Sequence, residues 1–225
     1  MIITKIKNHI SRLFAFSKVQ PISKVFGFDR GQPIDRYYIK KFIASKKESI
    51  KGDVLEVEEN SYTQLFAMEN STSYILKYAE AGKIESTFIY GDLTKLESIP
   101  YNSFDTFICT QTLSVIFDVE KAIQSIHSLL RKNGTALITV PCISQISRYD
   151  ADRWGDFWRF TPQGIEKLFK SVFGNDNVEL TIYGNSYSAT HFIKGFSSTE
   201  LKTIKLDAVD EDYPVIVALK VTKDE

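Results

Sequence analysis

The sequence predicts an α/β protein, with a mostly parallel sheet covered by helices on both faces. From residue 53 onward, short apolar runs alternate with amphipathic segments, and the runs are too short to be helices. Runs without polar alternation are typical of parallel strands buried on both sides. A length of 225 residues with 43% hydrophobic and 25% charged residues suits one globular domain with a complete core.

The apolar pattern predicts each element in turn. Pro33 opens a helix over 33–50, because proline suits the first helical turn. Further helices are predicted at 62–68, at 119–131 with Asn133-Gly134 as its cap, and from Thr161-Pro162 onward. The predicted strands cover 54–57, 73–78, 87–90, 104–110, 136–140, 178–183 and 215–221.

Charge is unevenly distributed, although the net charge is zero. Residues 1–52 carry 12 Lys and Arg against 3 Asp and Glu, whereas residues 53–225 carry 16 against 25. We therefore expect a basic helical arm over 1–30 and a single domain over 31–225. A zero net charge gives no support to nucleic-acid binding. Two interpretations of the arm remain: a helix packed on the acidic body, or a contact with an anionic membrane surface or a phosphate-bearing substrate.

The start of the chain does not resemble a signal peptide, because Lys5, Lys7, His9 and Arg12 interrupt it. No apolar run approaches the roughly 20 residues that span a bilayer. Cys109 and Cys142 lie in apolar runs, where they are typical of small core residues in a reducing compartment. We expect a cytoplasmic protein without a membrane span, a disulfide framework or a metal site.

Polar residues stand where several predicted strands end. In open α/β sheets, ligands bind beyond the carboxyl ends of the strands, where the strand order reverses. Polar residues also end strands for a simpler reason, since loops are solvated. Four polar strand ends in sequence nevertheless predict a nucleotide-type cofactor. These ends are Glu56 with the turn 58–61, Lys77-Tyr78, Gly91-Asp92-Leu93 and Thr110-Gln111.

Several motifs resemble those of class I S-adenosylmethionine-dependent methyltransferases of the type 11-like group. "VLEVEENSY" stands at the first motif, "YGDLTKLESIPYNSFDTFICTQTL" at the third and fourth, and "HSLLRKNGTALITVP" at the helix–strand unit that follows. "GQPIDRYYI" and "ISQISRYDADRWGDFWRFTPQGIEKLF" resemble bacterial members associated with glycan, capsule or polysaccharide biosynthesis. The resemblance implies a seven-stranded sheet with a reversed last strand, and methyl transfer from S-adenosylmethionine.

Each of these strand ends has a role for such a cofactor. Asp92 would accept from an exocyclic amine, with Leu93 beside a purine, and Thr110 and Gln111 would face the reacting centre. Glu56 would orient the first turn or accept from an ammonium group, and Glu59 and Asn60 lie in that turn. The resemblance adds Arg36 and Tyr37, because a helix before the first strand covers the cofactor in the family.

Two positions depart from the family pattern. Family members have a glycine-rich turn after the first strand, but this chain has no glycine between Asp53 and Gly82. They also have an acid at the end of the second strand, where this chain has Lys77-Tyr78. Glu58 adds bulk and negative charge near a cofactor carboxylate, so we expect Glu58→Gly to tighten cofactor binding.

A hydroxyl acceptor needs a base, and His191 in "SATHFIKG" is the candidate. A histidine that only packs on a helix surface is the alternative. The stretch 148–160 contains three arginines, three aspartates and two tryptophans. Aromatic faces stack on sugars, arginine grips phosphate or carboxylate, and aspartate accepts from hydroxyls. The substrate candidates are Arg148, Tyr149, Asp152, Arg153, Trp154 and Trp158, and a lid held by internal salt bridges is the other interpretation.

The leading hypothesis is an enzyme that transfers a methyl group from S-adenosylmethionine to a small acceptor, a sugar or glycan-linked hydroxyl. The alternative is a non-catalytic methyltransferase-like protein that binds a partner or glycan through its arm and aromatic loop. In that alternative, Glu58, Glu59 and Lys77 have abolished cofactor affinity.

Overall fold

The computed structural model describes residues 15–80 and 82–224, which form one eight-stranded sheet with helices around it. The strand order is β3-β4-β2-β1-β5-β6-β8-β7. The strands are β1 (Asp53–Val57), β2 (Thr72–Tyr78), β3 (Lys83–Glu85), β4 (Phe88–Gly91), β5 (Phe104–Thr110), β6 (Leu130–Pro141), β7 (Val178–Tyr183) and β8 (Ile216–Thr222). Neighbouring strands are parallel except at the short edge strand β3 and at β8, which runs antiparallel to β6 and β7. The expected mostly parallel sheet with a reversed last strand is confirmed.

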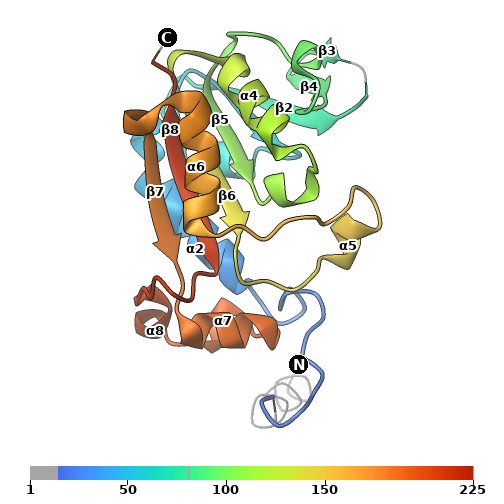
Figure 1. Cartoon of the computed structure of the whole chain (residues 1–225), viewed down its shortest axis with the longest axis vertical. Coiled ribbons are helices and arrows are strands. Elements are labelled where there is room, and N and C mark those ends of the chain that lie inside the picture. The colour runs from blue at the N-terminus through green and yellow to red at the C-terminus, as the bar shows by residue number, and fades with distance from the viewer. Residues whose placement is uncertain (1–14, 81, 225) are drawn as a thin grey trace.

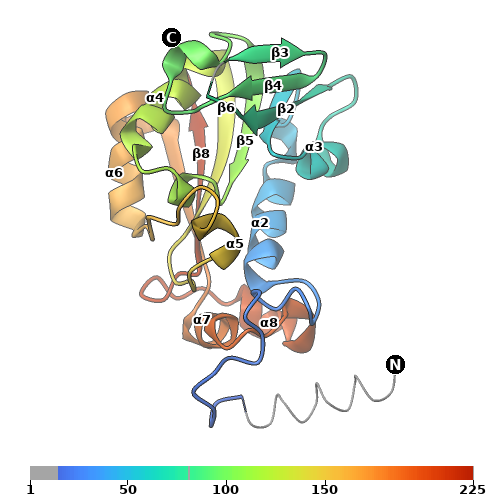
Figure 2. The ribbon, with the colours of Figure 1, turned by 90° about the vertical axis from the view of Figure 1, so that its right-hand side faces the viewer.

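Helices cover both faces of the sheet, as Figures 1 and 2 show. One face carries α2 (Ile34–Ser45) and α3 (Ser61–Phe66), and the other carries α4 (Val119–Leu129) and α6 (Pro162–Phe173). The helices α5 (Arg148–Ala151), α7 (Ser186–Ile193) and α8 (Thr203–Asp207) lie toward the carboxyl ends of the parallel strands. Short 3-10 turns cover Lys47–Ser49, Leu96–Ser98, Leu113–Val115, Asn175–Asn177 and Ser198–Glu200.

The core has two parts, one on each face of the sheet. Successive strand side chains point to opposite faces, so Val54 packs in the α2 cluster and Leu55 in the α4–α6 cluster. Leu137 and Ile138 of β6 divide in the same way. Burying a large aliphatic or aromatic side chain contributes about 1.5–3 kcal/mol, so the continuous apolar runs that predict the strands also stabilise both layers.

The predicted cap at Asn133-Gly134 is wrong, because β6 begins at Leu130, directly after α4. Leu130 pairs with Phe104, and the register then shifts before Thr135 pairs with Thr106. Asn133 sits at this irregularity with φ of 63°, and its N–H donates to the Lys223 carbonyl at 2.6 Å. Asparagine tolerates this left-handed conformation, so it bends a strand here instead of ending a helix.

Residues 15–30 of the predicted arm pack on the body at α7 and the segment that follows it. The N–H of Ile22 donates to the Lys194 carbonyl at 2.9 Å. Arg30 forms two hydrogen bonds with Glu200, at 3.0 and 2.6 Å, and both side chains are nearly buried. A Cβ on Gly195 would lie 2.4 Å from the Ser23 carbonyl oxygen, so this close approach requires glycine. Residues 1–14 lie outside the described residues, and so does the membrane or phosphate contact predicted from them.

Across the described ranges, no helix has the length and apolar character needed to cross a membrane. In the same ranges, no group of three or more His, Cys, Asp or Glu side chains is arranged to hold a metal ion.

Candidate active site at the carboxyl ends of the strands

Glu56 near the end of β1 positions the turn that follows it. Its side chain is buried, with Oε1 accepting from the Tyr62 N–H at 3.1 Å and Oε2 from the Thr63 N–H at 2.8 Å. The Thr63 hydroxyl also donates to Oε2, at 2.7 Å. Burial raises the pKa of Glu56, while the hydrogen bonds from Thr63 oppose that shift. Glu56 thus satisfies orphan N–H groups at the start of α3 and fixes the turn.

The two positions that depart from the family pattern contact each other. Glu58 has φ of 67°, the left-handed conformation that glycine adopts most easily. The Lys77 ammonium at the end of β2 donates to the Glu58 carbonyl oxygen and, at 3.1 Å, to its carboxylate. Lys77 therefore neutralises the charge that the sequence placed near a cofactor carboxylate.

The rest of the turn is held by short-range contacts. Asn60 donates to the Ser73 hydroxyl and accepts from the Gln64 side chain, both at 3.0 Å. Glu59 is exposed and accepts from the Ser61 hydroxyl at 3.3 Å. Of the implied cofactor contacts in this turn, Glu59 thus remains largely in solvent.

A second left-handed residue lies at the end of the neighbouring strand β5. Gln111 has φ of 57°. Its N–H donates to the Thr139 carbonyl at 2.8 Å, and its side-chain amide donates to the Thr139 hydroxyl at 3.2 Å. Thr110, just before it, is partly buried. Such backbone strain costs about 1–3 kcal/mol and concentrates at functional sites.

Asp92 and Leu93 follow β4. Asp92 Oδ1 accepts from the N–H and the hydroxyl of Thr94, both at 2.8 Å, and Oδ2 accepts no hydrogen bond from a described residue. That oxygen is available to an exocyclic amine. Leu93 is only 5% exposed and packs in the α4–α6 cluster, so its side chain serves the core.

The three residues after Ile34 in α2 point to different surroundings. The Tyr37 hydroxyl donates to Asp207 of α8 at 2.6 Å, and its pKa is raised to about 12, first by burial and then by that carboxylate. Asp35 and Arg36 instead line a cavity at the carboxyl ends of β5 and β6. The structure thus separates Tyr37 from the cavity and brings Arg36 to it.

This cavity has a volume of about 430 Å³. Its walls come from the N-terminal segment, the start of α2, the end of β5 and the loop after β6. The principal lining residues are Lys24, Phe26, Phe28, Asp35, Arg36, Gln111, Ser114, Gln145, Arg148, Tyr149, Asp150, Asp156 and Arg159.

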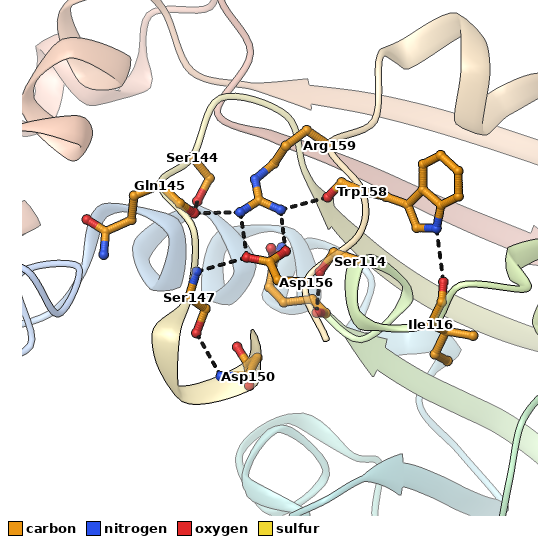
Figure 3. A network of polar contacts seen from close by, with 10 residues as sticks. Ser114, Ile116, Ser144, Gln145, Ser147, Asp150, Asp156, Trp158 and Arg159 are labelled. Atoms are coloured by element: carbon orange, nitrogen blue, oxygen red, sulfur yellow. Dashed lines mark hydrogen bonds and ion pairs between the residues drawn. The ribbon is translucent and has the colours of Figure 1, made fainter. Parts of the chain in front are cut away.

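The loop after β6 is held by an internal ion pair, shown in Figure 3. Arg159 donates to both oxygens of Asp156, at 2.5 and 2.8 Å, and to the Gln145 carbonyl at 2.6 Å. The Ser147 N–H donates to Asp156 Oδ2 at 2.8 Å. The hydrogen bond from Arg159 is the main cause that lowers the pKa of Asp156. This network has the form of the salt-bridged lid that the sequence left as one interpretation.

The substrate candidates in this loop fall into two groups. Arg148 and Tyr149 line the cavity. Arg153 stacks on the Tyr149 ring at 3.7 Å, and Trp154 packs edge-on against the same ring, but neither residue lines the cavity. Asp152 is exposed, and the Trp158 indole N–H donates to the Ile116 carbonyl at 3.1 Å.

His191 does not line the cavity. Its ring packs against Phe16, Tyr187 and Phe196, and its Nδ1 lies 2.7 Å from the Tyr187 carbonyl oxygen. This geometry matches the packing histidine that the sequence left as the alternative and gives no support to a base at this position.

Four cavity residues were not among the predicted site residues: Asp35, Gln145, Asp156 and Arg159. For Asp35 a signal existed: it lies one helical turn before Ile39 and two before Phe42, both buried. An acid inside the apolar stripe of a helix indicates a buried carboxylate. Gln145 accepts a hydrogen bond from Arg159 through its backbone carbonyl oxygen, and a backbone contact of this kind cannot be predicted from the residue type.

The donor set at these strand ends fits S-adenosylmethionine. Arg36 offers a cation to a carboxylate, Asp92 offers a free oxygen to an amine, and the β1 turn takes the left-handed path without glycine. When bound, this cofactor supplies a methyl group on a sulfonium.

Comparison with known proteins agrees with this geometry. Residues 50–138 match the sequence profile of the family described as "Methyltransferase domain". A search of curated proteins finds no match. Two similar solved structures are a SAM-dependent methyltransferase from Archaeoglobus fulgidus and one from Mesorhizobium loti. The first is 13% identical with a TM-score of 0.54, covering 84% of this chain and 94% of that one. The second is 14% identical with a TM-score of 0.50, covering 84% and 98%.

At this level of identity the two structures show the fold, which is that of class I methyltransferases. The match of residues 50–138 to the methyltransferase domain supports an enzyme that uses S-adenosylmethionine as its cofactor.

Proposed function

We propose that this enzyme methylates a hydroxyl of a sugar or of a glycan-linked small acceptor during polysaccharide biosynthesis. The observation that carries the proposal is the cavity at the ends of β5 and β6. Its volume of about 430 Å³ falls within the ~300–1,000 Å³ range of small-molecule sites. Its lining combines carboxylates, amides, cations and aromatic rings, the groups that bind sugar hydroxyls and faces.

Different residues are proposed to bind the two ligands. Glu56 and Asp92 would hold the cofactor at the ends of β1 and β4, and Arg36 on α2 would contact it from the cavity wall. The lid over 144–159 would cover the acceptor and exclude water. Methyl transfer is an in-line displacement, so alignment of the acceptor contributes much of the rate. We place the reaction in the cytoplasm, a proposal supported by the free thiols of Cys109 and Cys142.

Titration calorimetry with S-adenosylhomocysteine, followed by turnover assays, tests this proposal. The protein would be incubated with S-adenosylmethionine and glucose, glucose 1-phosphate, glucuronic acid or 4-nitrophenyl glucoside. Mass spectrometry would then detect one added methyl group. Binding of S-adenosylhomocysteine together with methylation of at least one sugar supports the proposal. If S-adenosylhomocysteine binds but no sugar is methylated, the proposed acceptor class is rejected. If S-adenosylhomocysteine does not bind even at high protein concentration, the non-catalytic alternative is favoured.

The lid is tested with Arg153→Ala, which removes the cation stacked on Tyr149. We expect lower turnover on a sugar acceptor and unchanged affinity for S-adenosylhomocysteine, because the two ligands use different strand ends. Lys167→Ala on α6 is the matched control. A large fall in melting temperature with loss of cofactor binding would instead show that Arg153 is purely structural.

A further inference from the structure

A hydroxyl acceptor needs a group that takes its proton, and His191 does not line the cavity. Three carboxylates do: Asp35, Asp150 and Asp156. Both oxygens of Asp156 accept hydrogen bonds from Arg159, and one also accepts from the Ser147 N–H. Both oxygens of Asp156 are therefore occupied within the lid. Asp35 and Asp150 remain as candidates for the group that takes the proton.

Asp35 differs from Asp150 in burial and in its free oxygen. Asp35 is only 9% exposed, whereas Asp150 lies on the half-exposed helix α5. Asp35 Oδ1 accepts from the Arg36 N–H at 2.8 Å. Oδ2 accepts no hydrogen bond from any other residue in 15–80 or 82–224, although the backbone N–H of Asp35 itself also donates to this carboxylate. It is also not fully enclosed, since the fully buried side-chain atoms without a partner in these ranges do not include it. Asp35 is also one of the residues that line the cavity.

The surroundings of Asp35 favour proton uptake. Burial raises its pKa, and the Arg36 guanidinium opposes that shift. Gln111, at the end of β5, lines the same cavity. The other titratable or charged groups around it are Tyr62 on α3, Lys24 on the N-terminal segment, Arg148 and Asp150 on α5, and the paired Asp156 and Arg159.

We infer that Asp35 is a catalytic residue whose Oδ2 binds the acceptor hydroxyl and accepts its proton. The inference rests on the proposed function. The acceptor O–H bond breaks, the proton moves to Oδ2, and the freed electron pair forms the new bond from oxygen to the methyl carbon. The bond from that carbon to sulfur breaks with its electron pair on sulfur, and Asp35 then releases the proton to water.

Two other roles for Asp35 give different results. An acid in the first turn of a helix can simply stabilise that helix. It can also bind the ammonium group of a cofactor. The first role predicts that losing the charge lowers stability, and the second predicts that it weakens cofactor binding.

The test compares Asp35→Asn with Asp176→Asn, an exposed acid on the 3-10 turn before β7 that does not line the cavity. For Asp35→Asn we expect turnover on the sugars named above to fall by roughly 100-fold or more, the usual size of a general-base effect. Affinity for S-adenosylhomocysteine should be unchanged. The melting temperature at pH 7 should equal or exceed that of the parent protein, since burial disfavours the ionised form. Asp176→Asn should leave all three values unchanged.

The pH profile gives a further readout. Turnover of the parent enzyme should rise with pH as Asp35 ionises, because burial raises the pKa of this carboxyl group. The Asp35→Asn variant should not show this rise of turnover with pH. Asp35→Glu should restore part of it.

Three results would overturn the inference: sugar turnover unaffected by Asp35→Asn, cofactor affinity lost in proportion to turnover, or a melting temperature lowered by several degrees. Absence of any sugar methylation by the parent enzyme would reject the proposed function itself, and the role of Asp35 with it.

Discussion

The two ends of the sheet are built differently. At the amino-terminal end, Arg131 donates to Asp53 of β1 at 2.8 Å and to Asp105 of β5 at 2.5 Å. Asp105 also accepts from the Asp53 N–H at 2.8 Å. Charges at this end are therefore matched across the central strands, and their role is to hold those strands together.

The carboxyl end carries unmatched polar groups instead. Glu58 and Gln111, at the ends of the neighbouring strands β1 and β5, are both left-handed. In the described ranges, Asp35 and Asp92 each have one carboxylate oxygen that accepts no hydrogen bond from another residue. Such features concentrate at functional sites, where a ligand can use the unmatched group. The contrast indicates that stability and ligand binding depend on opposite ends of this sheet.

The largest expected effect on the free energy of unfolding is an exception to this division. It concerns Asp156 and Arg159, an ion pair that stabilises the fold although it lies at the carboxyl end of the sheet. Asp156→Ala leaves Arg159 without its carboxylate. Breaking a buried pair costs about 3–5 kcal/mol, and partial exposure of Arg159 reduces our expectation to about 2–3 kcal/mol. Urea unfolding measures the loss. Arg159→Ala is the matched variant, and a double variant no worse than either single one would confirm the pair.

The same pair predicts a pH dependence. Arg159 lowers the pKa of Asp156 in the folded protein. Its stabilisation is therefore complete above the unfolded-state value of about 3.9 and is lost as pH falls through the lower folded-state pKa. The gap in unfolding free energy between the parent and Asp156→Ala should narrow in strong acid. A constant gap would contradict this cause.

Asp92→Ala should sharpen the comparison at the ligand end. Removing the carboxylate should weaken S-adenosylhomocysteine binding by about 1–3 kcal/mol, the penalty for an unmet polar group. Titration calorimetry measures it. Urea unfolding without ligand should change less than for Asp156→Ala. Unchanged affinity in a folded variant would remove Asp92 from the cofactor site.

Arg131→Ala should show the opposite behaviour. Its side chain is 40% exposed, so losing both ion pairs should cost only about 1 kcal/mol, and less at high salt. Cofactor affinity should not change, because the lost contacts lie at the other end of the sheet. A variant with normal stability and weakened cofactor binding would refute the division.

Glu58→Gly should give the smallest effect on stability. Glycine relieves a left-handed penalty of roughly 1–2 kcal/mol, but it adds about 0.5–1 kcal/mol of chain entropy. It also removes the exposed ion pair with Lys77, which contributes about 0–1 kcal/mol. The expected net change is therefore within about 0.5 kcal/mol of zero. Asn133→Gly is the control, because asparagine already tolerates this conformation. Calorimetric titration of the same variant tests the expected tightening of cofactor binding, and weaker binding would show that Glu58 makes a favourable contact.

The sheet could be predicted well from the sequence, because a strand that is buried on both faces appears as a continuous run of apolar residues. The strands 104–110 and 178–183 have the predicted limits, and the end of the 119–131 helix was wrong because its last residues pair with Phe104. The site was harder to predict, since its groups meet only in three dimensions. Neither Glu58 nor Lys77 alone reveals that each compensates the other. Equally, the aromatic composition of the lid did not show which side chains face inward.

The cavity wall at residues 24–28 has a consequence for how the protein is made. Arg30, next to that wall, bonds with Glu200, which is 170 residues away in the chain. At a synthesis rate of about 5–20 residues per second, Glu200 is synthesised on the order of 10–30 seconds after Arg30, so the wall lacks this contact during that time. The cofactor turn after β1 needs only nearby strands, so it can be complete much earlier. The turn after β1 can therefore form before the wall of the cavity is held in place.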